Sequence, residues 1–228
     1  MRKTLAISTV LLVTVLFAQD ASRSVAGGGI TAQGWAGKVD PGEEKQGKTI
    51  NDAKFTWEKD SNSYHVITGP ATTYWNPGNT AVGNYTVKAS FKEPKFMNLN
   101  SHPHPYGIFI GGQDMGTDKQ TFLYCEAYGN GKFVMRGFNP APFALNGRGE
   151  VSEAVNKAAG PGEPVAQEIA VSVKGDKIEC AVNGKVVGSY DKSAAVGEGK
   201  AKSTDGIYGV RFAHNTEGFV SGLTMSKQ

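Results

Sequence analysis

The chain has 228 residues, of which 39% are hydrophobic, 20% are charged and 30 are glycine. This length suits one domain with an extension, or two small domains. So few charges and so many glycines exclude a coiled coil or helical bundle, and an aromatic share of 10% excludes a disordered chain. The 24 basic residues are scattered among 21 acids, whereas a nucleic-acid binder concentrates its basic residues on one stripe. We therefore predict no nucleic-acid partner.

The first residues have the pattern of an export signal. Arg2 and Lys3 precede an apolar run over residues 5–18, which is shorter than the ~20 apolar residues that a membrane-spanning helix needs. We predict a signal peptide over residues 1–26, a secreted or periplasmic protein, and no stable membrane insertion after cleavage. An uncleaved anchor is the alternative. Small residues suited to cleavage are Ala18, Ala21 and Ala26.

The exported part divides by composition. Residues 27–49 are rich in glycine and poor in apolar residues, which predicts a linker or a loosely docked arm. Residues 50–228 form the predicted domain, in which short runs alternate between apolar and polar residues. The clearest runs lie within residues 168–190 and are separated by Gly-Asp and Asn-Gly, the signals for tight hairpin turns. They predict a three-stranded meander.

Other alternating runs predict further strands. A hairpin is expected over residues 121–138, and single strands over residues 55–59, 64–68, 84–91, 106–111, 206–213 and 219–226. One surface helix is expected over residues 151–159. So many short strands in one domain predict an all-β fold, an antiparallel two-sheet jelly-roll sandwich.

Alternation also predicts the two faces of strand 121–128. Its purely apolar set, Leu123, Cys125 and Ala127, suits the sandwich core. The opposite set is aromatic with one carboxylate: Phe122, Tyr124, Glu126 and Tyr128. Arg136 and Phe138 of the next strand join this second face. Such a face suits a sugar, because aromatic rings pack on its apolar side and charged groups bind its hydroxyls. Strands 169–182, by contrast, have a plain solvent face.

The aromatic face has a second interpretation. If the loop over residues 139–165 covered it, the chain would be a structural envelope protein without a small ligand. The two cysteines, Cys125 and Cys180, also leave alternatives open. Export into an oxidising compartment allows a disulfide between them, but both lie in apolar alternating runs and suit buried free thiols equally.

Four segments together resemble a known superfamily. They are residues 106–112 (YGIFIGG), 123–126 (LYCE), 171–184 (VSVKGDKIECAVNG) and 205–212 (DGIYGVRF). This order resembles the concanavalin A-like lectin/glucanase superfamily, and most closely the bacterial exported domains grouped with 3-keto-disaccharide hydrolases. The resemblance covers roughly residues 50–228 and implies two curved sheets with ligands on the concave face.

The resemblance and the aromatic face together give the candidate site. Glu126 is the candidate catalytic residue. The candidate ligand-binding residues are Trp75, Tyr106, Tyr124, Tyr128, Arg136, Phe138 and Arg211. Trp75 suits the core or the rim of a platform, and residues 74–78 (YWNPG) predict a strand end that runs into a turn. A carbohydrate is the predicted partner, and the protein is predicted to be a monomer.

The chain departs from the superfamily's glucanases in its acids. Their E-x-D-x-x-E strand is absent, and Glu126 stands alone on its strand. Glycoside hydrolysis requires two carboxyl groups at a set separation. Asp114 or Asp118 is the nearest candidate for the second. We therefore predict an exported, non-catalytic glycan-binding module. The alternative is a glycoside hydrolase acting on keto-disaccharides or related glycosides.

Two segments contain residue types that can bind metal ions. His102 and His104 flank a proline in an extended run, so both imidazoles could face one metal, but two ligands do not make a site. We predict no bound metal or cofactor from them. The resemblance implies that a structural calcium is possible in the loop over residues 114–118, although the full calcium-loop spacing is absent.

Overall fold

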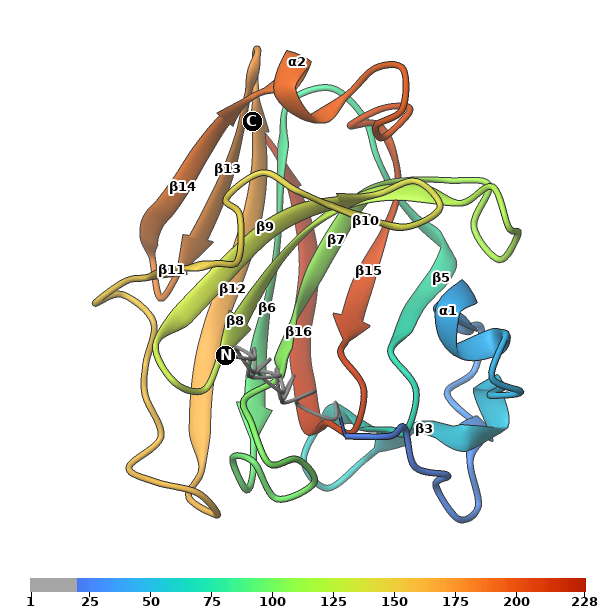
Figure 1. The fold of residues 1–228 in the computed structure, drawn as a ribbon. Coiled ribbons are helices and arrows are strands. Elements are labelled where there is room, and N and C mark those ends of the chain that lie inside the picture. The colour runs from blue at the N-terminus through green and yellow to red at the C-terminus, as the bar shows by residue number, and fades with distance from the viewer. Residues whose placement is uncertain (1–19) are drawn as a thin grey trace, which may run out of the picture.

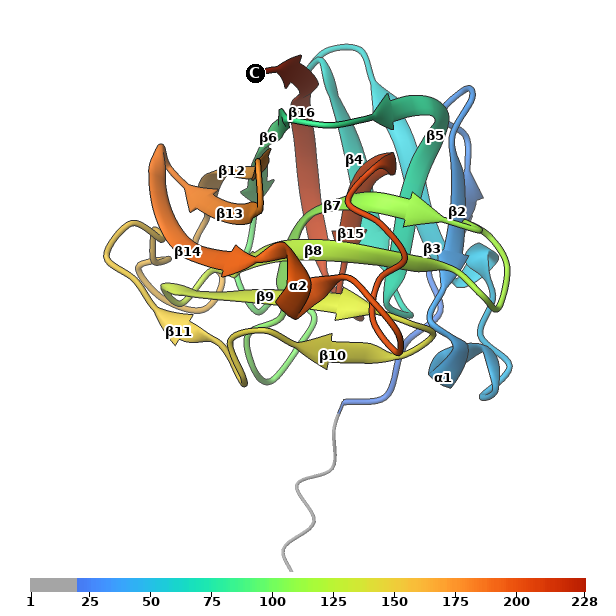
Figure 2. The ribbon, with the colours of Figure 1, turned by 90° about the horizontal axis from the view of Figure 1, so that it is seen from above.

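The computed structural model describes residues 20–228 and has two β-sheets packed face to face (Figures 1 and 2). Each sheet has eight strands, and nearly all the pairings are antiparallel. The predicted two-sheet jelly-roll sandwich is confirmed. Most of the predicted signal peptide lies outside the described residues. Within them, no helix has the length and hydropathy needed to cross a bilayer.

The first sheet, called sheet A, has the strand order β1-β3-β4-β16-β6-β12-β13-β14. Its strands are β1 (Gly29–Ile30), β3 (Ala53–Glu58), β4 (Ser63–Thr68), β6 (Tyr85–Glu93), β12 (Val165–Lys174), β13 (Lys177–Val182), β14 (Lys185–Asp191) and β16 (Glu217–Lys227). The predicted meander is β12–β13–β14. Asn183 and Gly184 both have positive φ angles in its second turn, as a tight hairpin requires.

The second sheet, sheet B, has the order β10-β9-β8-β7-β15-β5-β2, with β11 on the side of β9. Its strands are β2 (Ala36–Val39), β5 (Thr72–Ala81), β7 (Pro105–Gln113), β8 (Thr121–Tyr128), β9 (Lys132–Phe138), β10 (Pro142–Ala144), β11 (Glu150–Val151) and β15 (Gly206–Phe212). Three short helices lie outside the sheets: α1 (Pro41–Glu44), η1 (Ile50–Asp52) and α2 (Lys192–Ala195).

The core lies between the sheets and is built by the predicted alternation. From β8 it receives Leu123, Cys125 and Ala127, which are fully buried. Their partners across the core include Val171 of β12 and Cys180 of β13. Because strand side chains alternate, burying these residues turns the other set of each strand outward.

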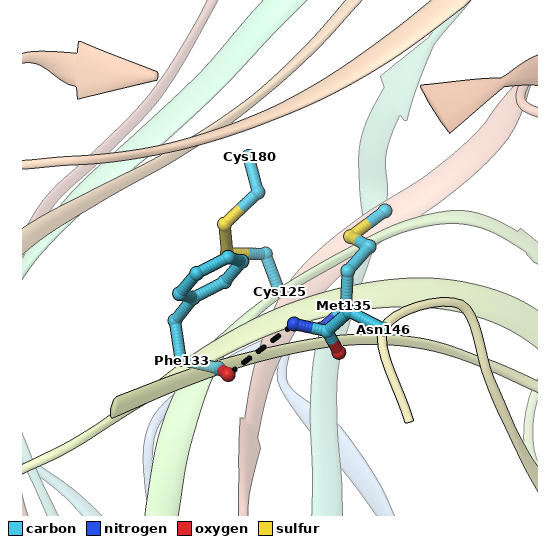
Figure 3. The surroundings of a disulfide bond; sticks show 5 residues. All are labelled: Cys125, Phe133, Met135, Asn146 and Cys180. Atoms are coloured by element: carbon cyan, nitrogen blue, oxygen red, sulfur yellow. Dashed lines mark hydrogen bonds between the residues drawn. A yellow bond between two sulfur atoms is a disulfide. The ribbon is translucent and has the colours of Figure 1, made fainter. Parts of the chain in front are cut away.

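A disulfide joins the two sheets. Cys125 of β8 is bonded to Cys180 of β13, with a Cα–Cα distance of 5.9 Å and 55 residues of separation (Figure 3). Phe133, drawn with it in Figure 3, belongs to the same buried core. Of the two interpretations left open by the sequence, the structure has the disulfide.

The N-terminal arm forms part of the sandwich. Its β1 pairs with β3 of sheet A, and its β2 pairs with β5 of sheet B. The residues before it are also docked, because Asn215 binds the backbone of both Ala21 and Arg23. These contacts lie within the segment predicted as a signal peptide, and cleavage after Ala26 would remove them.

Two local expectations from the sequence were wrong. Residues 76–78 (NPG) read as a turn, yet they lie inside β5, where the register of the neighbouring β15 shifts between Ile207 and Gly209. Proline is tolerated at such an irregularity because no ladder hydrogen bond is needed there. The helix expected over residues 151–159 is absent. Asn156 instead donates hydrogen bonds from that segment to β12.

Candidate functional site

The predicted site residues gather on the outer face of sheet B, here called the Glu126 face. It comprises Trp75, Phe109, Phe122, Tyr124, Glu126, Tyr128, Arg136, Phe138 and Arg211. The register places Tyr124 opposite Arg136, and Phe122 opposite Phe138. Tyr106, by contrast, points the other way and stacks on Phe91 and Phe212 in the sandwich core.

Arg211 is the centre of the polar network on this face. Its guanidinium donates to both carboxylate oxygens of Asp40, at 2.8 and 2.6 Å, and to Thr73 Oγ1 at 2.9 Å. It also lies 5.0 Å from the centroid of the Tyr124 ring. Burial alone would lower the pKa of Arg211, but the adjacent Asp40 outweighs burial and raises it. Arg211 is therefore a fixed, paired cation, 5% exposed.

Glu126 is the group on this face with acid–base potential. Arg211 Nε lies 3.6 Å from Glu126 Oε1. Gly107 of β7 lies between Arg211 on β15 and Glu126 on β8, and because it has no side chain the two groups can approach each other. Burial raises the pKa of Glu126 to about 7, and the charges of Arg211 and Arg136 only partly offset it. Glu126 Oε1 has no hydrogen-bond partner among the described residues. Glu126 can therefore exchange a proton near neutral pH.

Apart from the half-buried Tyr128, the aromatic rings of the Glu126 face are closed to solvent. Phe122, Tyr124 and Phe138 are each at most 1% exposed. Met115, Ile207 and Ala36 pack against the cluster, and Gly116 lies against the Trp75 ring. The loop over residues 139–165 was the predicted cover, but its Phe143 and Leu145 pack against the inter-sheet core instead. Buried rings present no face on which a sugar could stack.

Both acids suggested as a second carboxylate, and Asp40 near Glu126, face basic groups. Asp114 forms an ion pair with Lys202, and Asp118 Oδ1 lies 3.3 Å from Lys38 Nζ. Asp40 is held by Arg211. In the structure both loop carboxylates therefore face lysine ammonium groups, and the structural calcium stays a prediction.

An open pocket lies on the outer face of sheet A, here called the Phe219 pocket, with a volume of about 570 Å³. It is lined by Ser61, Ser63, Ser90, Phe91, Lys92, Asn156, Ala166, Gln167, Glu168, Asn183, Phe219 and Ser221. Phe219 is half-buried, and its ring stacks on His65 with 4.3 Å between centroids and planes 10° apart. His65 Nε2 in turn lies 3.0 Å from Glu217 Oε1. The pocket therefore combines a fixed aromatic ring with hydroxyl, amide and charged groups.

A hydrogen-bonded network fixes one wall of this pocket. Gln167 Oε1 accepts from the Asn156 backbone at 3.0 Å and from Asn183 Nδ2 at 2.8 Å. Gln167 Nε2 donates to the Asn156 carbonyl at 2.8 Å. Asn183 Oδ1 accepts from the Glu168 backbone at 2.8 Å. The loop carrying Asn156 and the hairpin carrying Asn183 are thus held in place without a ligand.

Replacing Gln167 with alanine is expected to destabilise the fold by about 2 kcal/mol, because buried donors and acceptors lose their partners. Gln167 is 2% exposed, so water cannot replace these bonds freely. Urea denaturation of Gln167→Ala beside the wild type measures the effect, with the exposed Glu198→Gln as the control. A change below ~0.5 kcal/mol, the range of ordinary surface substitutions, would contradict a structural role for the network.

Solved structures with this architecture are similar at low sequence identity. The carbohydrate binding module CBM66 from Bacillus subtilis has a TM-score of 0.53 and 8% identity, over 87% of this chain and 98% of that chain. Endo-beta-1,3-glucanase from Pyrococcus furiosus has a TM-score of 0.53 and 13% identity, over 89% and 91%. These likenesses show a shared architecture, the two-sheet jelly-roll sandwich. No known protein family matches the sequence, and no curated protein does.

A further structural neighbour, from Bacillus subtilis, is a protein of unknown function with a galectin-like fold. Its TM-score is 0.52 and its identity 10%, over 85% of this chain and 89% of that chain. At such identities the likeness establishes architecture and leaves activity open. The particular likeness to 3-keto-disaccharide hydrolases stays a prediction.

Sequence reasoning missed the residues of the Phe219 pocket. One signal was present: the buried Val220 turns both Phe219 and Ser221 outward in β16. The pairing of β16 with β6 brings Ser221 opposite Ser90, and this pairing joins strands far apart in the chain. The sequence does not reveal this pairing, so the solvent face of sheet A was predicted to be without a binding site.

Proposed function

We propose that the chain is an exported, non-catalytic glycan-binding module whose ligand occupies the Phe219 pocket. The observation that carries the proposal is the pocket itself, in which an aromatic ring lies beside polar groups on the outer face of sheet A. A pyranose has an apolar side suited to the Phe219 ring and hydroxyls suited to serine and asparagine side chains. Two structural neighbours, a carbohydrate binding module and a glucanase by their titles, support the choice of ligand.

Recognition suits the pocket better than catalysis. Among its lining residues only Lys92 and Glu168 are ionic, so a single carboxylate is present. Glycoside hydrolysis needs two carboxyl groups with distinct roles. Lys92 and Glu168 instead provide one donor and one acceptor of charge-assisted hydrogen bonds to sugar hydroxyls.

The Glu126 face supports a second candidate, a glycoside hydrolase. The specific observation is the unpartnered Glu126 Oε1 on a carboxyl group whose pKa burial raises to about 7. That is the state of a general acid at neutral pH. This candidate ranks second, because Asp40 is committed to Arg211 and the adjoining rings are buried.

Replacing Phe219 with alanine is expected to weaken glycan binding about tenfold, since an aromatic contact is worth up to about 1.5 kcal/mol. A glycan array selects the saccharide, and isothermal titration calorimetry of the full chain measures its affinity. Tyr128→Ala removes a half-buried ring from the Glu126 face and serves as the matched control, with unchanged affinity expected. The reverse pattern, in which only Tyr128→Ala weakens binding, would transfer the site to the Glu126 face.

A further inference from the structure

Three of the chain's four histidines gather at one end of sheet B. His102 and His104 precede β7, and His214 follows β15. The pairing of β7 with β15, which sets Tyr106 opposite Phe212, brings them together across 110 residues of sequence. One ring nitrogen from each lies within 4.8 Å of those of the other two. None of these histidines lines the Phe219 pocket.

The Nε2 atoms of the three histidines, here called the inner nitrogens, face one another. The Nδ1 atoms are called the outer nitrogens. His102 Nε2 and His104 Nε2 are 2.7 Å apart. His214 Nε2 is buried and has no hydrogen-bond partner among residues 20–228. A buried ring nitrogen without a partner costs free energy unless something binds it.

The outer nitrogens all face oxygen atoms. His104 Nδ1 donates to the His214 carbonyl at 2.8 Å. His214 Nδ1 lies 3.7 Å from Glu43 Oε1. His102 Nδ1 lies 3.3 Å from Ser101 Oγ and 3.7 Å from Asp20 Oδ2. Histidine ligands of metals typically present the outer ring nitrogen to a carbonyl or carboxylate, which directs the lone pair of the inner nitrogen at the metal.

We propose that His102, His104 and His214 bind a divalent transition-metal ion, with Zn²⁺ as the best fit, through their Nε2 atoms. Zn–N bonds of about 2.0–2.1 Å in a tetrahedral site place ligand nitrogens about 3.3 Å apart. His102 must therefore move outward by roughly half an ångström, and it is exposed and free to do so. Three imidazoles suit zinc, copper or nickel rather than calcium or magnesium. The sequence prediction of no metal lacked His214, the ligand that completes the set.

The fourth coordination position would be open. His214, Glu43 and Asp20 line a pocket of about 280 Å³ beside the cluster. Zinc sites with three protein ligands keep a position for water or for an oxygen atom of a ligand. The carboxylates of Glu43 and Asp20 lie beside the outer nitrogens of His214 and His102 and act as positioning groups rather than as ligands.

The test uses the full chain, purified without a histidine tag, stripped with a chelator and titrated with ZnCl₂ against a chromophoric competitor. We expect one ion per chain, and a thermal midpoint that rises with zinc. With CoCl₂ we expect the intense visible absorption of a tetrahedral site. Absence of saturable binding would overturn the proposal and leave the His102–His104 contact as a direct hydrogen bond.

Three substitutions locate the site. His102→Ala changes an exposed side chain, so it tests binding without endangering the fold, and a loss of tenfold or more in affinity is expected. His104→Ala should lose a hundredfold or more, with circular dichroism confirming the fold. His65, the remaining histidine, stacks on Phe219 elsewhere, so His65→Ala should retain full affinity. Equal losses in His65→Ala and His102→Ala would indicate unspecific binding and contradict the assignment.

Discussion

Replacing Cys125 and Cys180 together with alanine is expected to lower the free energy of unfolding by about 4 kcal/mol. The bond closes a loop of 55 residues and joins the two sheets through β8 and β13. In the chain-entropy account, opening a loop of that length increases the conformational entropy of the unfolded chain, which stabilises the unfolded state by about 4 kcal/mol. Both sulfur atoms are buried, so lost packing adds to the effect.

Urea denaturation followed by tryptophan fluorescence measures this change. The double variant leaves no unpaired thiol, and the wild type unfolded in a reducing agent provides the matched control with the side chains retained. The reduced wild type should lose slightly less stability than the double variant, since its sulfur atoms still fill the core. A difference below ~1 kcal/mol between oxidised and reduced protein would contradict a stabilising crosslink.

Replacing Glu126 with glutamine is expected to stabilise the protein at pH 8 by roughly 3 kcal/mol. Burial raises the pKa of Glu126 from 4.5 to about 7, so between these values the folded state holds a proton that the unfolded state has lost. Stability therefore falls as the pH rises through this window, since the folded state binds more protons. A difference of about 2.5 pKa units corresponds to roughly 3 kcal/mol.

The test measures the free energy of unfolding of the wild type and Glu126→Gln at pH 4.5 and at pH 8. At pH 4.5 the wild-type Glu126 is already neutral in the folded state, so Glu126→Gln and the wild type should differ little. Glu93 retains a second dependence of similar size in both proteins, because burial also raises its pKa from 4.5 to about 7. The exposed Glu198→Gln controls for loss of charge. A variant less stable than the wild type at pH 8 would show that the ionised carboxylate and Arg211 stabilise each other in the fold.

The local sequence pattern predicted the strands well and the candidate functional site poorly. The two-residue turns of β12–β13–β14 and the alternation of β8 are local signals, and each is correct in the structure. β5 was misread because its Asn76-Pro77-Gly78 segment has turn chemistry, although the flanking pairs, Trp75 with Gly209 and Thr80 with Ile207, keep the strand continuous. Tertiary pairing overrides local propensity at such places.

The candidate site depends on contacts that the sequence does not display. Alternation correctly placed Tyr124 and Glu126 on one face, but nothing in the pattern indicated that Met115 and Ile207 would close it. The partner of Arg211 is Asp40, from the segment expected to be a linker or a loosely docked arm. Contacts between residues more than a hundred positions apart depend on which strands are neighbours in the sheet. The alternation of apolar and polar residues does not predict this strand order.

The central claim is that a glycan binds the Phe219 pocket on sheet A rather than the Glu126 face on sheet B. Amide chemical-shift mapping with a saccharide selected on the array tests it most directly. The account predicts saturable shifts at Ser90, Asn156, Asn183 and Phe219, with β8 and β9 unchanged. Shifts confined to Tyr124, Glu126 and Arg136 would contradict it and make the Glu126 face the binding site.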